Sequence, residues 1–404
     1  MGFFYPDTMI KRNEYLSRLH SSYLFYEIAQ RKQKFISENP GVDLLNLGIG
    51  DTTLPIPATV SEAMAEAAKK LGTPEGYSGY GPASGSEELR ERISREIYRG
   101  RVDPDEIFIS DGSKCDIGRL QTLFGPNAKI AVQDPTYPAY VDGSLIHGVC
   151  DISYMPCVPG NDFFPDLNHA KGSDLIYFCS PNNPTGNVAS KQQLEALAAF
   201  AQKQQSIIIF DSAYSGFIQN SDLPRSIFEI PGAEKCAIET GSFSKLAGFT
   251  GVRLGWTVVP KELQYSDGSH VYPDWVRVVS TIFNGPSNVA QAGGLALLSP
   301  EGKKEAKSLI SVYMAGARKL LHSLSGQGGE VYGGADCPYI WVRFPGQDSW
   351  KVFQNLLEEC RIVTVPGAGF GPSGEGFVRF SAFAKPADID RALINLTGLP
   401  STVH

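Results

Sequence analysis

The stretch SFSKLAGFTGVRLG, residues 242–255, places a lysine after small hydroxyl residues, with an arginine eight positions further on. A lysine amine is a poor nucleophile until burial or neighbouring charges lower its pKa. Hydroxyl groups and a guanidinium suit a phosphate ester, and glycines let the backbone approach it closely. An ordinary surface lysine in a glycine-rich loop is the alternative, but the full pattern favours a phosphate-bearing site around Lys245.

Outward from this stretch, short β-rich runs alternate with helical stretches between about residues 60 and 285. Continuous apolar runs at 107–110, 129–132, 174–179 and 206–210 indicate strands buried on both faces, and residues 191–205 indicate a helix. This alternation predicts an α/β fold with a doubly wound, mostly parallel sheet. Ligands of such sheets bind beyond the carboxyl ends of the strands, which is where the polar motifs lie.

The C-terminal third has a different pattern. Strands are expected at 339–344, 361–365 and 376–380, around a helix at 349–360, which suggests a smaller α+β domain. The N-terminal segment, which ends near residues 54–57, is expected to pack with it. We therefore expect a large domain at 56–285 and a small domain formed by 1–55 and 286–404 together.

The lysine motif, with Asp211 and Tyr214 directly after the apolar run 207–210, resembles that of the fold-type I pyridoxal-phosphate (PLP) family, the aspartate aminotransferase superfamily. The resemblance implies that pyridoxal 5'-phosphate is held as a Schiff base on Lys245. It also implies that Asp211 pairs with the pyridinium nitrogen and that Tyr214 bonds the ring phenolate oxygen. A carboxylate that keeps this nitrogen protonated lets the ring absorb the electrons of a carbanion.

Further motifs match this family in the same order along the chain: NLGIGD at 46–51, GYSGYGP at 76–82, DGSK at 111–114, DPTYP at 134–138, SPNNPTG at 180–186 and FVRFS at 377–381. By resemblance, Tyr137 stacks on the cofactor ring, and Arg379 binds the substrate α-carboxylate bidentately. The implied cofactor contacts are Tyr80, Ser113, Lys114, Tyr137, Asn183, Asp211, Tyr214, Ser242, Ser244, Lys245 and Arg253. The implied substrate contacts are Tyr23, Gly50, Lys114, Tyr137, Asn183, Asn284 and Arg379.

Several of these stretches, and the segments at 224–231 and 369–377, are most similar to one branch of the family, the LL-diaminopimelate aminotransferases. This branch moves an amino group between LL-diaminopimelate and 2-oxoglutarate in the synthesis of lysine and peptidoglycan precursors. Some members carry a glutamate, thought to read the distal ammonium of the substrate, where this chain has Ala83. A broad-specificity aminotransferase and a PLP-dependent β-lyase of the same fold therefore stay open as alternatives.

Composition limits the other classes of function. The net charge of −7 and the absence of a basic helix-turn-helix region argue against a nucleic-acid-binding relative. The seven cysteines include no C-x-x-C pair, so neither a disulfide framework nor a metal site is expected. No apolar run suggests a membrane span. We expect a cytoplasmic protein, or a plastid one after removal of a transit peptide. By resemblance, Tyr80 and Asn284 cross a dimer interface, which implies a homodimer with shared active sites.

Overall fold

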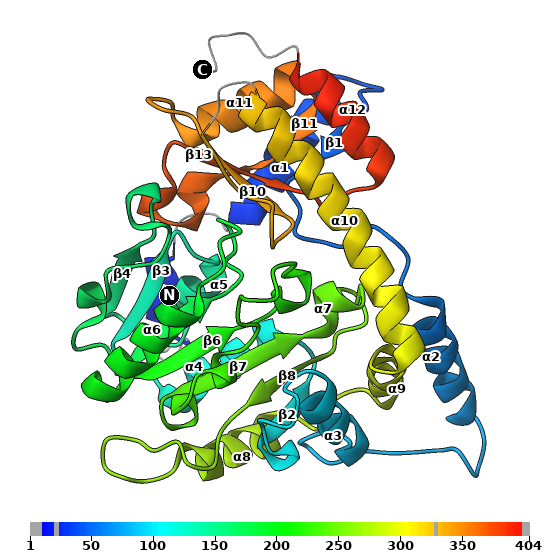
Figure 1. Cartoon of the computed structure of the whole chain (residues 1–404), viewed down its shortest axis with the longest axis vertical. Helices are drawn as coiled ribbons and strands as arrows, with labels where there is room; N and C mark the ends of the chain where they lie inside the picture. Colours follow the sequence, from blue (N-terminus) through cyan, green and yellow to red (C-terminus); the bar gives the residue numbers. More distant parts are fainter. Residues whose placement is uncertain (1–9, 20–23, 327–329, 398–404) are drawn as a thin grey trace, which may run out of the picture.

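The computed structural model describes residues 10–19, 24–326 and 330–397, and Figure 1 shows a larger lower part and a smaller upper part. The lower part is built on a seven-stranded sheet of order β2-β8-β7-β6-β5-β3-β4. All neighbours are parallel except that β8 runs antiparallel to both β2 and β7. The bounds are β2 (Ile107–Ser110), β3 (Ile130–Asp134), β4 (Ile152–Pro156), β5 (Leu175–Cys179), β6 (Ile207–Asp211), β7 (Ala237–Ser242) and β8 (Gly255–Val258).

Helices cover both faces of this sheet because successive strand residues point to opposite sides. In β5, Leu175 and Tyr177 pack into a buried cluster with residues of α4, α5 and α8, whereas Ile176 and Phe178 pack with α6. The helices of this part are α2 (Ala58–Lys70), α3 (Glu87–Glu96), α4 (Ser113–Phe124), α5 (Pro138–Ile146), α6 (Lys191–Gln204), α7 (Phe243–Leu246), α8 (Val271–Ile282) and α9 (Asn288–Leu297). The sheet is therefore the doubly wound α/β arrangement that the sequence predicts.

The smaller part holds a four-stranded antiparallel sheet, β12-β13-β10-β9, and the parallel pair β1-β11. Its elements are α1 (Leu24–Glu38), β1 (Leu45–Asn46), β9 (Glu330–Gly333), β10 (Tyr339–Arg343), α11 (Ser349–Glu359), β11 (Ile362–Val363), β12 (Val365–Pro366), β13 (Phe377–Ser381) and α12 (Pro386–Leu396). The long helix α10 (Pro300–Gly326) runs from the lower part, beside α9 and α2, up to α12 and the small sheet (Figure 1). The N-terminal segment thus packs with the C-terminal third through the β1-β11 pair.

One strand prediction is wrong in its extent. The run 361–365 was expected to form one strand, but it forms β11 and β12, which belong to different sheets. The chain changes sheets at Thr364, which is fully buried. The Thr364 carbonyl lies against Gly48, where an added Cβ would come within 2.5 Å of the oxygen. Packing against the N-terminal segment, which no local pattern reveals, therefore interrupts the strand.

The division of the chain at residues 56 and 285 stays a prediction. Helix α9, which follows residue 285, places Ala290 and Leu297 in the same buried cluster as Val60 of α2 and Ile107 of β2. The packing of α9 therefore belongs to the larger sheet, and α10 is the element that carries the chain from one part to the other.

Candidate active site

Lys245 lies in the short helix α7, a single helical turn that directly follows β7. The Ser242 side chain caps this helix by accepting a hydrogen bond from the Ser244 amide at 3.0 Å. The Lys245 amine donates to the carbonyl of Gly50, which comes from the N-terminal segment. Burial, joined by the charges of Arg379 and Arg253, lowers the pKa of Lys245 to about 8, although Asp51 opposes the shift. The amine is thus closer to neutral than a surface lysine and can act as a nucleophile.

Asp211 ends the adjacent strand β6 and is almost fully buried. Its Oδ2 accepts a hydrogen bond from the Tyr140 hydroxyl at 2.7 Å, and its Oδ1 accepts one from the Ala213 amide at 3.0 Å. Burial raises the pKa of Asp211, and both hydrogen bonds work against that shift. A carboxylate in such a position is held in one orientation and gains most from a cationic partner in the cavity.

Tyr140 is a part of this site that the sequence analysis did not single out. Its ring stacks on Tyr177 with centroids 5.3 Å apart and meets Tyr137 edge-on at 5.7 Å. It lies within the DPTYPAY stretch, but nothing local indicates that its hydroxyl reaches a strand 71 residues away.

Arg379 lies at the opposite side of the cavity, on β13, and its side chain is 1% exposed. Its guanidinium donates to Asn183 Oδ1 at 2.5 Å and to the Gly48 carbonyl at 2.6 Å, and it stacks on the Tyr339 ring at 4.3 Å. Its Nε has no hydrogen-bond partner, and no carboxylate pairs with it among the described residues. A buried cation without a counter-ion indicates a site for an anionic ligand.

Tyr339 joins two predicted residues that the sequence does not connect. Its hydroxyl lies 2.8 Å from the Tyr214 hydroxyl, while its ring lies against Arg379. Burial raises the pKa of Tyr339 to about 12 and raises that of Tyr214 well above its usual value, so both phenols stay protonated and can donate. Like Tyr140, Tyr339 was missed because it acts through a contact between distant parts of the chain.

The other end of the cavity holds donors that suit a phosphate group. Gly112, with φ of +118°, opens helix α4, and a Cβ at this position would collide with the guanidinium of Arg253. Arg253 in turn donates to Ser244 Oγ at 3.4 Å and to the Thr250 carbonyl at 3.2 Å. The amino end of a helix, serine hydroxyls and a guanidinium are together a fitting set of donors for a phosphate monoester.

These groups surround one cavity of about 400 Å³. The predicted residues that line it are Gly50, Ser113, Lys114, Tyr137, Asn183, Asp211, Tyr214, Ser242, Ser244, Lys245, Arg253 and Arg379. A phosphate cradle at one end, a buried carboxylate at the sheet and an unpaired buried guanidinium opposite fit the three charged or polar ends of PLP and of an amino acid. The residues present therefore fit the cofactor that the motifs imply.

Three predicted residues do not line this cavity. Tyr23 lies outside the described residues. Tyr80 is 88% exposed, and Asn284 is exposed as well. Their loops lie side by side, because Asn288 donates to Ser78 Oγ at 2.9 Å and to the Gly79 carbonyl at 3.2 Å. The two residues thus belong to one surface of the molecule, outside the site formed by their own chain.

Metal-ligating side chains, cysteines and long apolar helices were considered as well. No group of three or more metal-ligating side chains occurs in the part of the chain that the structure describes. All seven cysteines are free. Within 10–19, 24–326 and 330–397, no helix is both long and apolar enough to cross a bilayer.

Known proteins resemble this chain over most of its length. The family model for aminotransferase class I and II matches residues 42–396. The chain is 55% identical to the LL-diaminopimelate aminotransferase of Protochlamydia amoebophila (strain UWE25), over 95% of this chain and 96% of that protein. It is 51% identical to the chloroplastic enzyme of Arabidopsis thaliana, over 95% and 85% of the two chains.

A solved structure of the L,L-diaminopimelate aminotransferase of Chlamydomonas reinhardtii matches with a TM-score of 0.94 and 52% identity, covering 97% of this chain and 99% of that one. A structure of the Thermotoga maritima aspartate aminotransferase, at 23% identity and a TM-score of 0.82, shares the fold. On these grounds the chain belongs to the class I and II aminotransferases and, within them, to the LL-diaminopimelate aminotransferase family.

Proposed function

We propose that this protein is an aminotransferase that uses pyridoxal 5'-phosphate to move an amino group between LL-diaminopimelate and 2-oxoglutarate. The observation that carries the proposal is the cavity in which a lysine of lowered pKa, a buried carboxylate and an unpaired buried guanidinium face one another. The sequence identity of 51–55% to the named relatives supports the choice of substrate.

The cofactor would be held by the donors already described. Ser113, Ser242, Ser244 and Arg253 would bind its phosphate, Lys245 would hold it covalently, and Asp211 would pair with its ring nitrogen. When bound, this cofactor supplies an electron sink that stabilises negative charge at the substrate α-carbon. Asn183 and Tyr214 would donate to its ring oxygen, with Tyr339 fixing the Tyr214 hydroxyl.

The chain's own residues then divide the work on the substrate. Arg379 grips the α-carboxylate with two parallel hydrogen bonds and so fixes the direction of the α-C–H bond. The Lys245 amine lines the cavity and, once the amino group of the substrate has released it, would take the α-proton, because a base of lowered pKa within reach is effective at physiological pH. Asp211 keeps its charge next to the ring, held in place by the hydroxyl of Tyr140.

Homodimer formation is part of the proposal. Tyr77 is 72% and Tyr80 is 88% exposed, and a Cβ on Gly285 would come within 2.8 Å of the Pro82 carbonyl, so the loops of Tyr80 and Asn284 form one continuous surface. Large exposed aromatic side chains that gather on one surface favour contact with another protein chain. We infer that this surface meets a second copy and completes its active site.

Ala83 lies in the same surface and bears on specificity. It is half-buried beside Gly285, and it supplies no carboxylate for the distal ammonium of LL-diaminopimelate. A broader choice of amino donors is therefore the second candidate function.

An amino-donor screen with 2-oxoglutarate as acceptor tests both candidates. LL-diaminopimelate is expected to give the highest kcat/KM, and Lys245→Ala is expected to remove turnover and the visible absorption of the bound cofactor. Comparable kcat/KM values for several unrelated donors would favour the broad-specificity enzyme. Release of ammonia and a 2-oxo acid without an acceptor would instead indicate a β-lyase.

A further inference from the structure

A second cavity, which we call the rear cavity, lies directly behind the turn that carries Lys245. Its volume is about 330 Å³. Ala213 and Ser242 line both this cavity and the active-site cavity, so the two share a wall. Leu246, the neighbour of Lys245, also lines the rear cavity and packs so closely on Gly216 that a Cβ there would come within 2.9 Å of it.

The rear cavity is cationic although the chain as a whole has a net charge of −7. Among the described residues, its charged lining consists of Arg99, Arg101, Arg225, Lys303, Glu96 and Glu229. Both carboxylates are already engaged: Glu96 pairs with Lys303 at 2.5 Å, and Glu229 accepts a hydrogen bond from the Arg225 amide at 2.8 Å. Lys303 is thus paired, and the charge of Glu229 acts on Arg225, so four cations and two carboxylates leave the lining with a net positive charge.

The guanidinium groups of the lining have donors to spare. Arg99 forms no hydrogen bond or ion pair with any residue in the described ranges, and Arg101 donates one hydrogen bond, to the Tyr98 carbonyl at 3.4 Å. Arg225 is half-buried and anchored to the carbonyls of Ser215 at 3.0 Å and Ile218 at 2.8 Å. Burial lowers the pKa of Arg225, Glu229 opposes this shift, and the nearby charge of Arg99 adds to it, with Asp336 again opposing. An anion between Arg99 and Arg225 would relieve their repulsion.

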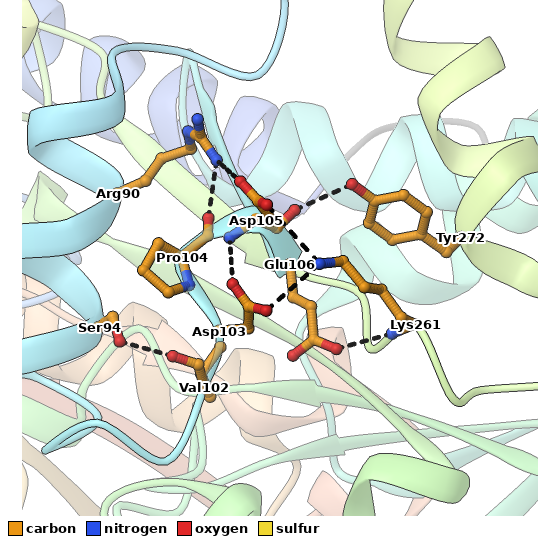
Figure 2. Close-up of polar contacts among 9 residues, drawn as sticks. All are labelled: Arg90, Ser94, Val102, Asp103, Pro104, Asp105, Glu106, Lys261 and Tyr272. Carbon is orange, nitrogen blue, oxygen red and sulfur yellow. Dashed lines mark hydrogen bonds and ion pairs between the residues drawn. The ribbon is translucent and has the colours of Figure 1, made fainter.

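The backbone that presents Arg99 and Arg101 is fixed on both sides. The Gly100 amide donates to the Ser94 carbonyl at 2.9 Å, and the Ser94 hydroxyl donates to the Val102 carbonyl at 2.5 Å. Beyond Val102 the chain enters an ion-pair cluster in which Lys261 joins Asp103 at 3.2 Å and Asp105 at 3.7 Å (Figure 2). The two arginines thus extend from a preorganised segment, which lowers the entropic cost of binding a ligand.

We propose that the rear cavity binds a small dianion, a dicarboxylate or a phosphate, between Arg99, Arg101 and Arg225. Guanidinium groups bind both kinds of anion bidentately, and the cavity has the size of a small-molecule site. Bound there, the anion presses on the wall formed by Ala213 and Ser242 and so bears on the turn that carries Lys245. None of the three arginines lines the active-site cavity.

Calorimetric titration of the cofactor-loaded protein with succinate and, separately, with inorganic phosphate tests the site at constant ionic strength. We expect at least one probe to bind with a dissociation constant on the order of 1 mM or tighter. Arg379 can also bind a carboxylate, so the heat of binding can come from two sites. Only the binding that the variants weaken reports on the rear cavity. Arg99→Gln and Arg101→Gln are each expected to weaken it about tenfold, the effect of one lost charge-assisted hydrogen bond.

Arg343→Gln is the matched control. It removes one cation from β10, outside the rear cavity, where the side chain is 44% exposed and paired with Glu330. Its titration is expected to equal that of the wild type. Identical isotherms for Arg99→Gln and the wild type, or an equal loss in Arg343→Gln, would overturn the site. If the bound anion acts on the turn that carries Lys245, the probe should alter kcat in the wild type and not in Arg99→Gln. An unaltered wild-type kcat would overturn this connection between the rear cavity and the active site. The binding measurement does not depend on which amino acid the enzyme uses.

Discussion

The amine of Lys245 shares its cavity with two guanidinium groups, those of Arg253 and Arg379, and with the carboxylate of Asp51. Burial and the two cations lower the pKa of the amine to about 8, and Asp51 raises it. The covalent attachment of a carbonyl cofactor needs the neutral amine. We therefore expect the environment of this one residue to influence the pH at which the protein takes up the proposed cofactor.

We predict that the rate at which the cofactor-free protein takes up pyridoxal 5'-phosphate, followed by visible absorption, rises with pH through a midpoint of about 8. Asp51→Asn removes the charge that stabilises the protonated amine, so the midpoint is expected to move to lower pH. Lys245→Ala provides the control without a covalent band. An uptake rate that does not change between about pH 6.5 and 9 would contradict this account of the amine.

Tyr140 is the residue through which Asp211 keeps its orientation. Tyr140→Phe removes the hydroxyl that donates to Oδ2 at 2.7 Å and leaves the stacked ring in place. Loss of a hydrogen bond to a buried charge is expected to lower kcat about tenfold or more and to speed cofactor release, with a smaller effect on KM. Steady-state assays measure kcat and KM, and dialysis against cofactor-free buffer measures the release of the cofactor.

Tyr177→Phe is the matched control for Tyr140→Phe. It removes a hydroxyl from the other ring of the same stacked pair, on β5, and no hydrogen bond in the described chain joins that hydroxyl to Asp211. Equal losses of kcat in the two variants would assign the effect to packing and not to the orientation of Asp211.

At the scale of the elements, α4 connects the phosphate end of the site with the loop of Asn284. Ser113 and Lys114 at its start line the active-site cavity. Two turns later, Arg119 binds Asp111 at 2.8 Å and Asp116 at 2.9 Å, and its guanidinium lies 4.0 Å above the Phe283 ring, next to Asn284. Burial raises the pKa of Asp116 to about 6 even with Arg119 beside it, so this carboxylate depends on the arginine.

We predict that Arg119→Met raises KM for the amino donor several-fold, with a smaller change in kcat, because the loop of Asn284 loses its anchor. Phe283→Leu removes the other half of the same contact. If the contact is the cause, the effects of the two substitutions on KM are less than additive in the double variant. Additive effects, or an unaltered KM in both single variants, would show that this contact does not set the position of the loop.

The elements also show how far the sequence could predict this structure. The run 107–110 coincides with β2, and the helix expected at 191–205 differs from α6 by a single residue. Both depend on local signals, a continuous apolar run and a capping residue, Ser190, at the helix start. The break of 361–365 into β11 and β12 depends on a segment more than 300 residues away, which a local pattern does not contain.

The same limit applies within the site. Lys245, Asp211 and Arg379 lie in recognisable motifs, and the structure brings them to one cavity. Tyr140 and Tyr339 carry no motif of their own, because their roles arise from hydroxyls that meet partners 71 and 125 residues away. Sequence patterns therefore reveal the groups proposed to contact the cofactor more readily than the groups that hold them in place.

At the scale of the whole molecule, the chain by itself leaves two predicted contacts outside its own cavity. Tyr80 is 88% exposed, and Ile282, close to Asn284 in the sequence, is 53% exposed. Tyr77 is 72% exposed as well, and large exposed aromatic and aliphatic side chains of this kind are typical of protein interfaces. A two-fold symmetric dimer would carry each such surface to the cavity of the other copy.

Mixing two inactive variants tests this arrangement. One is Lys245→Ala, and the other combines Tyr80→Phe with Asn284→Ala. In a mixed dimer, one site joins the intact Lys245 of the second variant to the intact Tyr80 and Asn284 of the first, so it contains every group. With random exchange of subunits, half of the dimers are mixed and one of their two sites works, so about a quarter of wild-type activity is expected.

Lys245→Ala mixed with Asp211→Ala is the control: both residues serve the cavity of their own chain, so no mixed dimer contains an intact site. Activity restored in this control, or none restored in the first mixture although exchange is complete, would show that Tyr80 and Asn284 do not serve the partner's site.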